Sequence, residues 1–286
     1  MKKYTFLTFL FGFVLMFGCQ SKKEEQTESQ SDTATKSPII QKIAELKAAG
    51  YDIVDYHGHL KGGLTMEQLL EHSDSTGIKY GVAFNAGLKF PIQDDSTLLA
   101  TLEQYKDYPV YMAMQAEGRE WVDMFDMENI KKFDYVFTDA MTWTDRKGRR
   151  MRLWMPEEVF VDDKEDFMDQ LVEKIVYVME KEPIDIYVNS TFLPVVLQPE
   201  YDALWTEERM DKVINAAVAN DVAIEINARY KIPSAKFIKR AKAAGAKFSM
   251  GTNNPANELG TLDYAIEMIE ECGLEPSDFF KPEKKM

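Results

Sequence analysis

The chain has 286 residues, of which 45% are hydrophobic and 12% aromatic. This is enough apolar surface for one large folded domain or two small ones, and it excludes a globally disordered chain. The formal net charge is -14, so we expect no nucleic-acid partner and no direct binding to an anionic membrane surface. A small anionic substrate is not excluded, because a metal or a nearby arginine can reverse the field at one site.

The first 18 residues are expected to be a secretion signal outside the fold. Lys2 and Lys3 precede an apolar run, Phe6 to Gly18, that is as long as a signal-peptide core and short for a membrane span. The run ends at Gly18-Cys19, which resembles the lipobox of bacterial lipoproteins. That resemblance implies a lipid on Cys19, an anchor in the lipid bilayer, and a location in the bacterial cell envelope on the periplasmic or outer-surface face. An ordinary cleaved signal or an uncleaved anchor is the alternative.

Residues 19–37 are polar and rich in Ser, Thr, Gln and Glu. Such a segment cannot bury enough apolar surface to offset the entropy lost on ordering, so we predict a flexible tether. The folded domain is then expected to span residues 38–286. Cys272 is the other cysteine of the chain, and we expect it to be a small buried hydrophobe near a helix end.

From residue 38 onward, helical and strand patterns alternate. Residues 65–77 are one predicted helix, because Thr65 and Gln68 have capping-box spacing and Gly77 can end it. Residues 142–163 interrupt the alternation and predict an inserted hairpin with a turn at residues 145–148. The predicted helices cover residues 38–50, 65–77, 94–107, 126–132, 164–183, 206–221, 234–245 and 258–273, and the predicted strands cover residues 51–57, 79–85, 108–118, 133–141, 184–194, 222–230 and 246–255.

This alternation predicts an α/β fold with a parallel sheet covered by helices. The sheet can close into a (β/α) barrel or stay open as a doubly wound sheet. We favour the barrel, because functional residues of barrels gather at the carboxyl ends of several strands, where the unusual polar residues of this chain fall. They are His57, His59, Asn85, Gln115, Glu117, Thr138, Asp139, Asn189, Thr191, Glu225, Asn227, Asn253 and Asn254, with Arg119 and Arg229 just beyond.

Two of the three histidines, His57 and His59, follow an apolar strand and precede a Gly-rich turn. Residues two apart in a strand project to the same face, so both imidazoles can point into one barrel mouth, as can Gln115 and Glu117. Convergence on a cation would satisfy polar groups that are costly to bury. Imidazole and carboxylate ligands together suit Zn²⁺, Mn²⁺ or Fe²⁺. A purely structural role of the two histidines is the alternative.

The stretch VDYHGHLKGGLTMEQLLEHSDSTGIKYGVAFNAG, residues 54–87, resembles the PHP family (polymerase and histidinol phosphatase). Domains of that family open with a His-x-His strand, followed by a helix and a second strand that contains Gly and Ala. The resemblance implies a distorted (β/α)7 barrel that binds up to three divalent ions and hydrolyses phosphate esters.

The resemblance also implies a set of metal ligands. His57 and His59 match the opening ligands of the family, and Glu117 matches the carboxylate at the end of its third strand. At other positions this chain has an amide where the family has a charged or imidazole ligand. Since amide oxygens bind transition metals more weakly, we expect one ion, or two, rather than three. The expected ligands are His57, His59, Glu117, Asp139, Asn189 and Asn253.

The leading hypothesis is a membrane-tethered, metal-dependent hydrolase acting on a phosphate ester or a similar small anionic substrate. The ion would lower the pKa of a bound water, and Asp139 or Glu225 would be the general base. Arg119 and Arg229 would neutralise the anion at the mouth. The basic stretch at residues 146–152 is either a lid with a further anion contact or a solvated hairpin.

Two alternatives stay open. A barrel that has lost half of the ligands of its family could be a catalytically inactive, tethered protein that binds a small polar ligand through asparagines and arginines. An amidohydrolase-type barrel also begins with His-x-His, but that family needs further histidines. The third histidine here, His72, is expected on the surface or at the cap of a helix.

Overall fold

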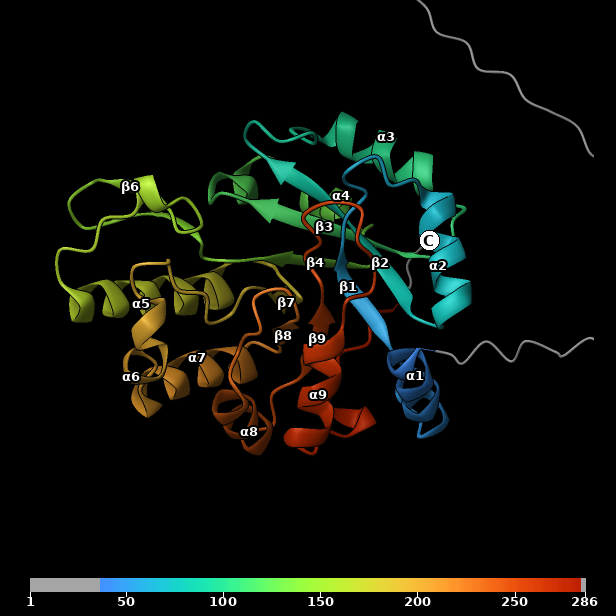
Figure 1. The fold of residues 1–286 in the computed structure, drawn as a ribbon. Coiled ribbons are helices and arrows are strands. Elements are labelled where there is room, and N and C mark those ends of the chain that lie inside the picture. Colours follow the sequence, from blue (N-terminus) through green and yellow to red (C-terminus); the bar gives the residue numbers. More distant parts are fainter. Residues whose placement is uncertain (1–36, 284–286) are drawn as a thin grey trace, which may run out of the picture. The chain divides into compact units, whose positions relative to one another are not determined.

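A closed ring of parallel strands forms the centre of the fold. The computed structural model describes residues 37–283; the predicted signal peptide and nearly all of the predicted tether lie outside this range. The ring confirms the predicted α/β fold, a distorted (β/α)7 barrel, and excludes an open sheet (Figure 1). Its strands are, in order around the ring, β1 (Val54–Gly58), β2 (Lys79–Gly87), β3 (Tyr111–Glu117), β4 (Tyr135–Thr138), β7 (Ile186–Tyr187), β8 (Ala223–Asn227) and β9 (Phe248–Gly251), which pairs with β1.

Helices connect the strands along the outside of the ring, and α5, α7, α8 and α9 pack one against the next (Figure 1). No helix within residues 37–283 is both long and apolar enough to cross a membrane. The α-helices are α1 (Pro38–Ala48), α2 (Met66–Thr76), α3 (Asp95–Tyr105), α4 (Met127–Ile130), α5 (Lys164–Lys181), α6 (Tyr201–Leu204), α7 (Glu207–Ala219), α8 (Ala235–Ala243) and α9 (Asp263–Glu271), and the 3-10 turns are η1 (Glu120–Asp123), η2 (Pro156–Glu158), η3 (Gln198–Glu200) and η4 (Pro276–Asp278).

The helix ends follow local sequence signals. Thr65 accepts a hydrogen bond from the Gln68 backbone in the predicted capping box, and Gly77 ends α2 in the left-handed conformation at φ 77°. The start predicted for the last helix, residue 258, was wrong, because α9 begins at Asp263. Gly260 has φ 63°, a conformation outside the right-handed helix, so residues 258–262 form a loop.

The inside of the ring is filled by apolar side chains at its amino-terminal end. Tyr135 donates a hydrogen bond of 2.6 Å to the carbonyl of Tyr56. Their strands, β4 and β1, are not neighbours in the ring, so this contact crosses the interior. Phe280 packs edge-on against both tyrosine rings. Because this end is closed by aromatic residues, polar groups can gather only at the carboxyl ends of the strands.

One irregularity in β1 decides which side chains face inward. Asp55 pairs with Tyr80 of β2, but Gly58 pairs with Val82, so β1 carries one extra residue. A bulge of this kind changes which face the following side chains occupy. Tyr56 faces the interior and so does the next residue, His57, whose ring lies 4.6 Å from the ring of Phe137 on the non-adjacent strand β4. Without the bulge, simple alternation would turn His57 outward.

The predicted hairpin is confirmed. Strands β5 (Thr142–Thr144) and β6 (Arg150–Arg152) pair antiparallel, and the carboxylate of Asp145 holds the turn by accepting from the backbone of Lys147 and Arg149. β6 lies on the side toward which the arrowheads of β2 and β3 point (Figure 1). The insertion therefore stands beside the carboxyl ends of the barrel strands.

The packing inside the ring predicts the effect of one methyl group. A Cβ at Gly81 would lie 1.9 Å from the hydroxyl of the fully buried Tyr135. We expect Gly81→Ala to lower the free energy of unfolding by about 1–3 kcal/mol, measured by urea denaturation. Tyr135→Phe should cost about 1 kcal/mol on its own. The double variant should lose less than the sum, because the clashing hydroxyl is gone; strictly additive losses would contradict this packing.

Candidate active site

The polar strand ends meet in one cavity of about 390 Å³, which we call the barrel mouth. It opens at the carboxyl ends of the strands, as the barrel prediction required. Predicted site residues that line it are Asn85, Gln115, Glu117, Asp139, Asn189, Arg229 and Asn253; Lys61 and the aromatic residues Phe90, Trp154 and Tyr230 complete much of the wall.

His57 is fixed by a carboxylate beneath the mouth. His57 and Glu225 are each 1% exposed, and Nδ1 of the imidazole lies 2.6 Å from Oε1 of Glu225. Oε2 of the same carboxylate accepts from the Asn189 backbone at 2.8 Å and from Nδ2 of Asn227 at 2.9 Å. The carboxylate is thus fully engaged, which suits orienting the imidazole more than acting as a general base, the role suggested for Glu225 from sequence.

His59 is equally buried and is neutral at physiological pH. Burial lowers the pKa of His59 to about 2, and the neighbouring His57 and Lys61 act in the same direction. Its backbone N–H donates to Oδ1 of Asn254 at 2.7 Å. Nε2 of His57 and Nε2 of His59 both have no hydrogen-bond partner among residues 37–283. Two buried nitrogens without partners are costly, and this points to a ligand for them.

The spacing of these imidazoles agrees with that of two ligands on one transition-metal ion. A ring bound through Nε2 at about 2.0 Å has its centroid roughly 3 Å from the ion, so two rings on one tetrahedral ion have centroids roughly 5 Å apart. The ring centroids of His57 and His59 are 5.2 Å apart. The carboxylates do not complete the set: within the described residues, no group of three or more His, Cys, Asp or Glu side chains is placed to hold an ion.

Glu117 is held by neighbouring amides. Its Oε1 accepts from Nδ2 of Asn85 at 2.6 Å and from Nε2 of Gln115 at 3.0 Å. Burial, together with the charge of Asp139, raises the pKa of Glu117 to about 7, and the Asn85 hydrogen bond and Lys61 oppose this shift. A carboxyl group of this kind exchanges its proton near neutral pH.

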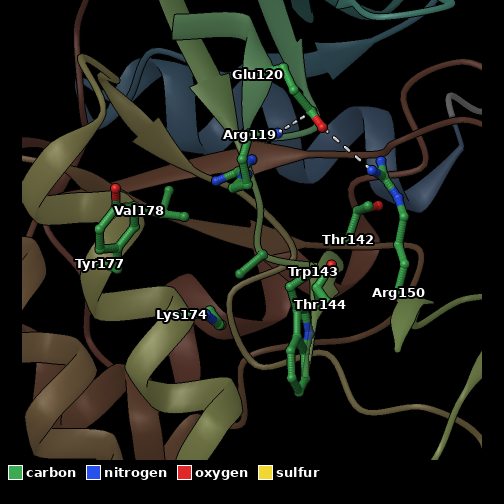
Figure 2. A pocket seen from close by; sticks show the side chains of 10 residues that line it. Arg119, Glu120, Thr142, Trp143, Thr144, Arg150, Lys174, Tyr177 and Val178 are labelled. Carbon is green, nitrogen blue, oxygen red and sulfur yellow. Dashed lines mark hydrogen bonds and ion pairs between the residues drawn. The ribbon is translucent and has the colours of Figure 1, made fainter. Parts of the chain in front are cut away.

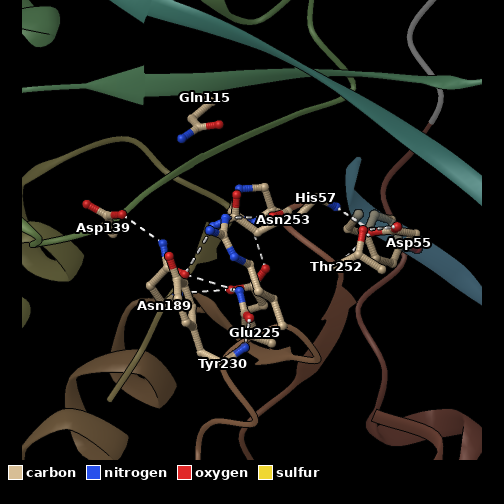
Figure 3. A network of polar contacts seen from close by, with 12 residues as sticks. Asp55, His57, Gln115, Asp139, Asn189, Glu225, Tyr230, Thr252 and Asn253 are labelled. Atoms are coloured by element: carbon tan, nitrogen blue, oxygen red, sulfur yellow. Dashed lines mark hydrogen bonds and ion pairs between the residues drawn. The ribbon is translucent and has the colours of Figure 1, made fainter. Parts of the chain in front are cut away.

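Asp139 and the asparagines form a connected network (Figure 3). Asp139 accepts from the Met141 backbone and from Nδ2 of Asn189, each at 2.9 Å, and burial raises the pKa of this carboxyl. Oδ1 of Asn189 accepts from Asn227 at 3.1 Å and from Asn253 at 3.5 Å. The amide oxygen of Asn189, expected as a metal ligand, is therefore taken up by other amides.

Asn189 and Asn253 have left-handed backbones, with φ 52° and φ 44°. Asparagine tolerates this conformation better than other residues with a Cβ. These two residues therefore form turns, and their amides link strand ends.

The two arginines predicted at the mouth differ. The guanidinium of Arg119 donates to Glu182 and to Oγ1 of Thr138, both at 2.8 Å. It is bound within the protein, so the predicted substrate contact through Arg119 is replaced by an internal ion pair. Arg229 is exposed, donates to the Asn253 carbonyl at 3.2 Å, and lies 5.0 Å over the ring of Tyr230. Arg229 is held beside the mouth with its charge available.

Three other predicted positions lie outside the mouth. Thr191 bonds to the hydroxyl of Tyr201, and His72 on α2 lies 2.8 Å from the hydroxyl of Tyr80. Cys272 is buried at the carboxyl end of α9, as predicted. Thr191 and His72 therefore have local structural partners.

Sequence reasoning missed Asp55. This residue is fully buried and accepts from the His57 backbone at 3.1 Å and from the Thr252 backbone and hydroxyl at 3.0 and 2.5 Å. Burial raises the pKa of Asp55, and the Thr252 and His57 hydrogen bonds oppose that shift. The available signal was an acidic residue inside an apolar strand, two residues before the first histidine.

Comparison with solved structures identifies the fold. A histidinol phosphate phosphatase from Lactococcus lactis subsp. lactis Il1403, crystallised with zinc, L-histidinol and phosphate, superposes with a TM-score of 0.56 at 14% identity. The match covers 81% of this chain and 100% of the phosphatase. The chain has a PHP-type fold. The resemblance found in residues 54–87 is thereby confirmed for the architecture. No family model matches the chain, and a search of curated proteins finds no match.

The raised pKa of Glu117 predicts a pH dependence of stability. The folded-state pKa of about 7 lies above the usual 4.5, so the neutral carboxyl is favoured by folding. Its contribution is complete below about pH 4.5 and is lost as the pH rises through about 7. In chelator-treated protein, the stability of the wild type relative to Glu117→Gln should fall over this window by up to about 3 kcal/mol, measured by urea denaturation. A difference independent of pH would show that Glu117 ionises normally.

Proposed function

We propose that this protein is a PHP-type hydrolase of phosphate esters or similar small anions and that it depends on one or two divalent ions, Zn, Mn or Fe. The observation that carries the proposal is the pair of buried imidazoles with unpartnered Nε2 atoms. His59 lines a neighbouring cavity that shares Lys61 and Asn85 with the mouth, and the mouth is bordered by Lys61 and Arg229. The architectural match to a phosphatase crystallised with zinc and phosphate supports the same reaction class.

His57 and His59 would hold the ion through Nε2, and Glu117 would supply a carboxylate after release from Asn85 and Gln115. When bound, the ion would lower the pKa of a water molecule and offset the negative charge of the substrate. Glu225 keeps Nδ1 of His57 occupied, so the lone pair of Nε2 stays directed to the ion site.

The other mouth residues have distinct proposed roles. Asp139 would accept a proton, since it borders the mouth and its pKa is raised by burial. Arg229 would bind the anion, because its exposed guanidinium is steadied by the Asn253 carbonyl and the Tyr230 ring. Arg119 would position the end of β3 through its ion pair with Glu182.

A second candidate is a catalytically inactive protein that binds a small polar ligand. It is favoured by the hydrogen-bonded asparagines Asn189, Asn227 and Asn253 and by the lack of a three-ligand group among residues 37–283. A purified wild-type protein without metal, and without a thermal shift on addition of Mn²⁺ or Zn²⁺, would favour this candidate.

We further propose that Cys19 carries a lipid and holds the barrel at the bacterial cell envelope. The support is the sequence alone: an apolar run of signal-peptide length ends directly at this cysteine. The following 18 polar residues would then separate the barrel from the bilayer.

The metal hypothesis is tested by removing one imidazole. His59→Ala should bring bound metal close to zero by elemental analysis and lower phosphate-ester turnover by more than about 100-fold. His72→Ala is the matched control, because that histidine bonds to Tyr80 outside the mouth and should leave both quantities unchanged. Turnover that survives in His59→Ala would eliminate the proposed metal site.

The anchor is tested by Cys19→Ser in the full-length chain. Lipidation requires the thiol, so this variant should lose incorporation of labelled palmitate and leave the membrane fraction. A Cys272→Ser chain is the control and should remain labelled. Equal labelling of the wild type and the Cys19 variant would contradict lipidation at this position.

A further inference from the structure

A second cavity adjoins the barrel mouth. It has a volume of about 570 Å³ and lies between the loop that follows β2 and the strand β6 with its continuation. We call it the hairpin groove. Phe90, Glu117 and Trp154 line both the mouth and the groove. A bound molecule can therefore extend from the strand ends across Glu117 into the groove.

The junction between the two cavities is aromatic. Trp154 follows β6 and is 43% exposed, although an indole ring is normally well buried. Phe90, in the loop after β2, is half-buried on the same junction. Two aromatic side chains along an open passage provide flat faces on which a ring can stack.

The groove is lined by both basic and acidic side chains, and two of the basic ones are weakly paired or unpaired in residues 37–283. Arg150 reaches toward Glu120 at 3.5 Å, with side chains that are 60% and 49% exposed. Figure 2 shows this pair at the edge of a neighbouring pocket that Arg119, Lys174 and Tyr177 also line. An exposed pair at this distance is weak and can be exchanged for a ligand anion. Lys89 takes part in no ion pair within the described residues. Arg152, by contrast, is tied to Glu158 at 2.6 Å.

We propose that the hairpin groove is a subsite for the organic part of the substrate: a flat ring that stacks on Trp154 and Phe90 and carries a negative group bound by Arg150 and Lys89. This deepens the proposed function and rests on it, because the phosphate ester would lie at the mouth. The preferred substrate class is then a ring-bearing phosphate ester with a second anionic group.

Three non-hydrolysable probes separate the parts of this proposal. Ethylphosphonate reports the mouth, benzylphosphonate adds a ring, and 4-carboxybenzylphosphonate adds the second negative group. In calorimetric titrations of the wild-type protein loaded with Zn²⁺, the ring should improve Kd by about tenfold. The carboxylate should improve it by about a further threefold.

Each gain should depend on its own residues. Trp154→Ala should abolish the ring gain, and Trp154→Phe should keep part of it. Arg150→Ala and Lys89→Ala should abolish the carboxylate gain and leave the ring gain. Glu120→Gln should increase the carboxylate gain, since it frees Arg150. Phe160→Ala is the matched control: this ring is 40% exposed on the same insertion but stacks under Arg149, outside the groove.

The results distinguish failure of the subsite from failure of the proposed function. A ring gain that persists in Trp154→Ala, or that disappears equally in Phe160→Ala, overturns the subsite. Lack of ethylphosphonate binding counts against the phosphate-ester function. The groove is then tested separately with p-toluate, which has the ring and the carboxylate but no phosphonate. Binding of p-toluate that weakens in Trp154→Ala and Arg150→Ala supports the subsite, and binding unaffected by both variants overturns it.

Discussion

The buried carboxylate of Asp55 is the group on which the geometry of the site depends. It accepts hydrogen bonds from the backbone of His57, one bond within β1, and from the backbone and hydroxyl of Thr252, directly after β9. A buried acid without partners would be strongly destabilising, so these bonds are required together. They close the ring between its first and last strands and hold the bulge that turns His57 inward. The same carboxylate thus contributes both to the closure of the barrel and to the inward direction of the His57 imidazole.

The space for that inward imidazole comes from the end of the neighbouring strand β9. A Cβ at Gly251, the last residue of β9, would lie 2.2 Å from Oε1 of Glu225 and 2.7 Å from Cβ of His57. The glycine is needed because the histidine and the glutamate meet over it. Phe137 covers the ring of His57 from the interior. The imidazole is therefore buried on all sides, and its Nε2 is a buried nitrogen without a hydrogen-bond partner among residues 37–283.

The architecture followed from the sequence because its signals are local. Seven apolar strands, caps such as Thr65 and stops such as Gly77 are each set by neighbouring residues. The spacing of the two histidines also predicted that both would share one face. The bulge could not be predicted, because it depends on Thr252, 197 residues away from Asp55. Without it, the same spacing would have placed both imidazoles on the outer face.

Long-range pairing also explains the residues whose roles changed. Arg119 was expected at the mouth because it follows β3, but its partner, Glu182, lies 63 residues further along the chain. No sequence feature near Arg119 predicts that it pairs with Glu182. The asparagines are a similar case, since Asn189 contacts Asn253 across 64 residues. Position at a strand end predicted that Asn189 and Asn253 line the mouth, and the partners of their amide groups are residues that only the fold brings together.

Most of the positive charge of the inserted hairpin is paired within the protein. Arg146 is paired with Glu173, and Arg149 is paired with Asp145 and Asp162. Their positive charge is neutralised locally by ion pairs with acidic residues of the hairpin and of α5. Arg150, whose pair is the longest of this group at 3.5 Å, is the exception. Because short pairs neutralise its neighbours, the positive charge of the proposed subsite would be confined to the side of the hairpin that faces the groove, and the overall acidic charge of the protein would not need to be reversed.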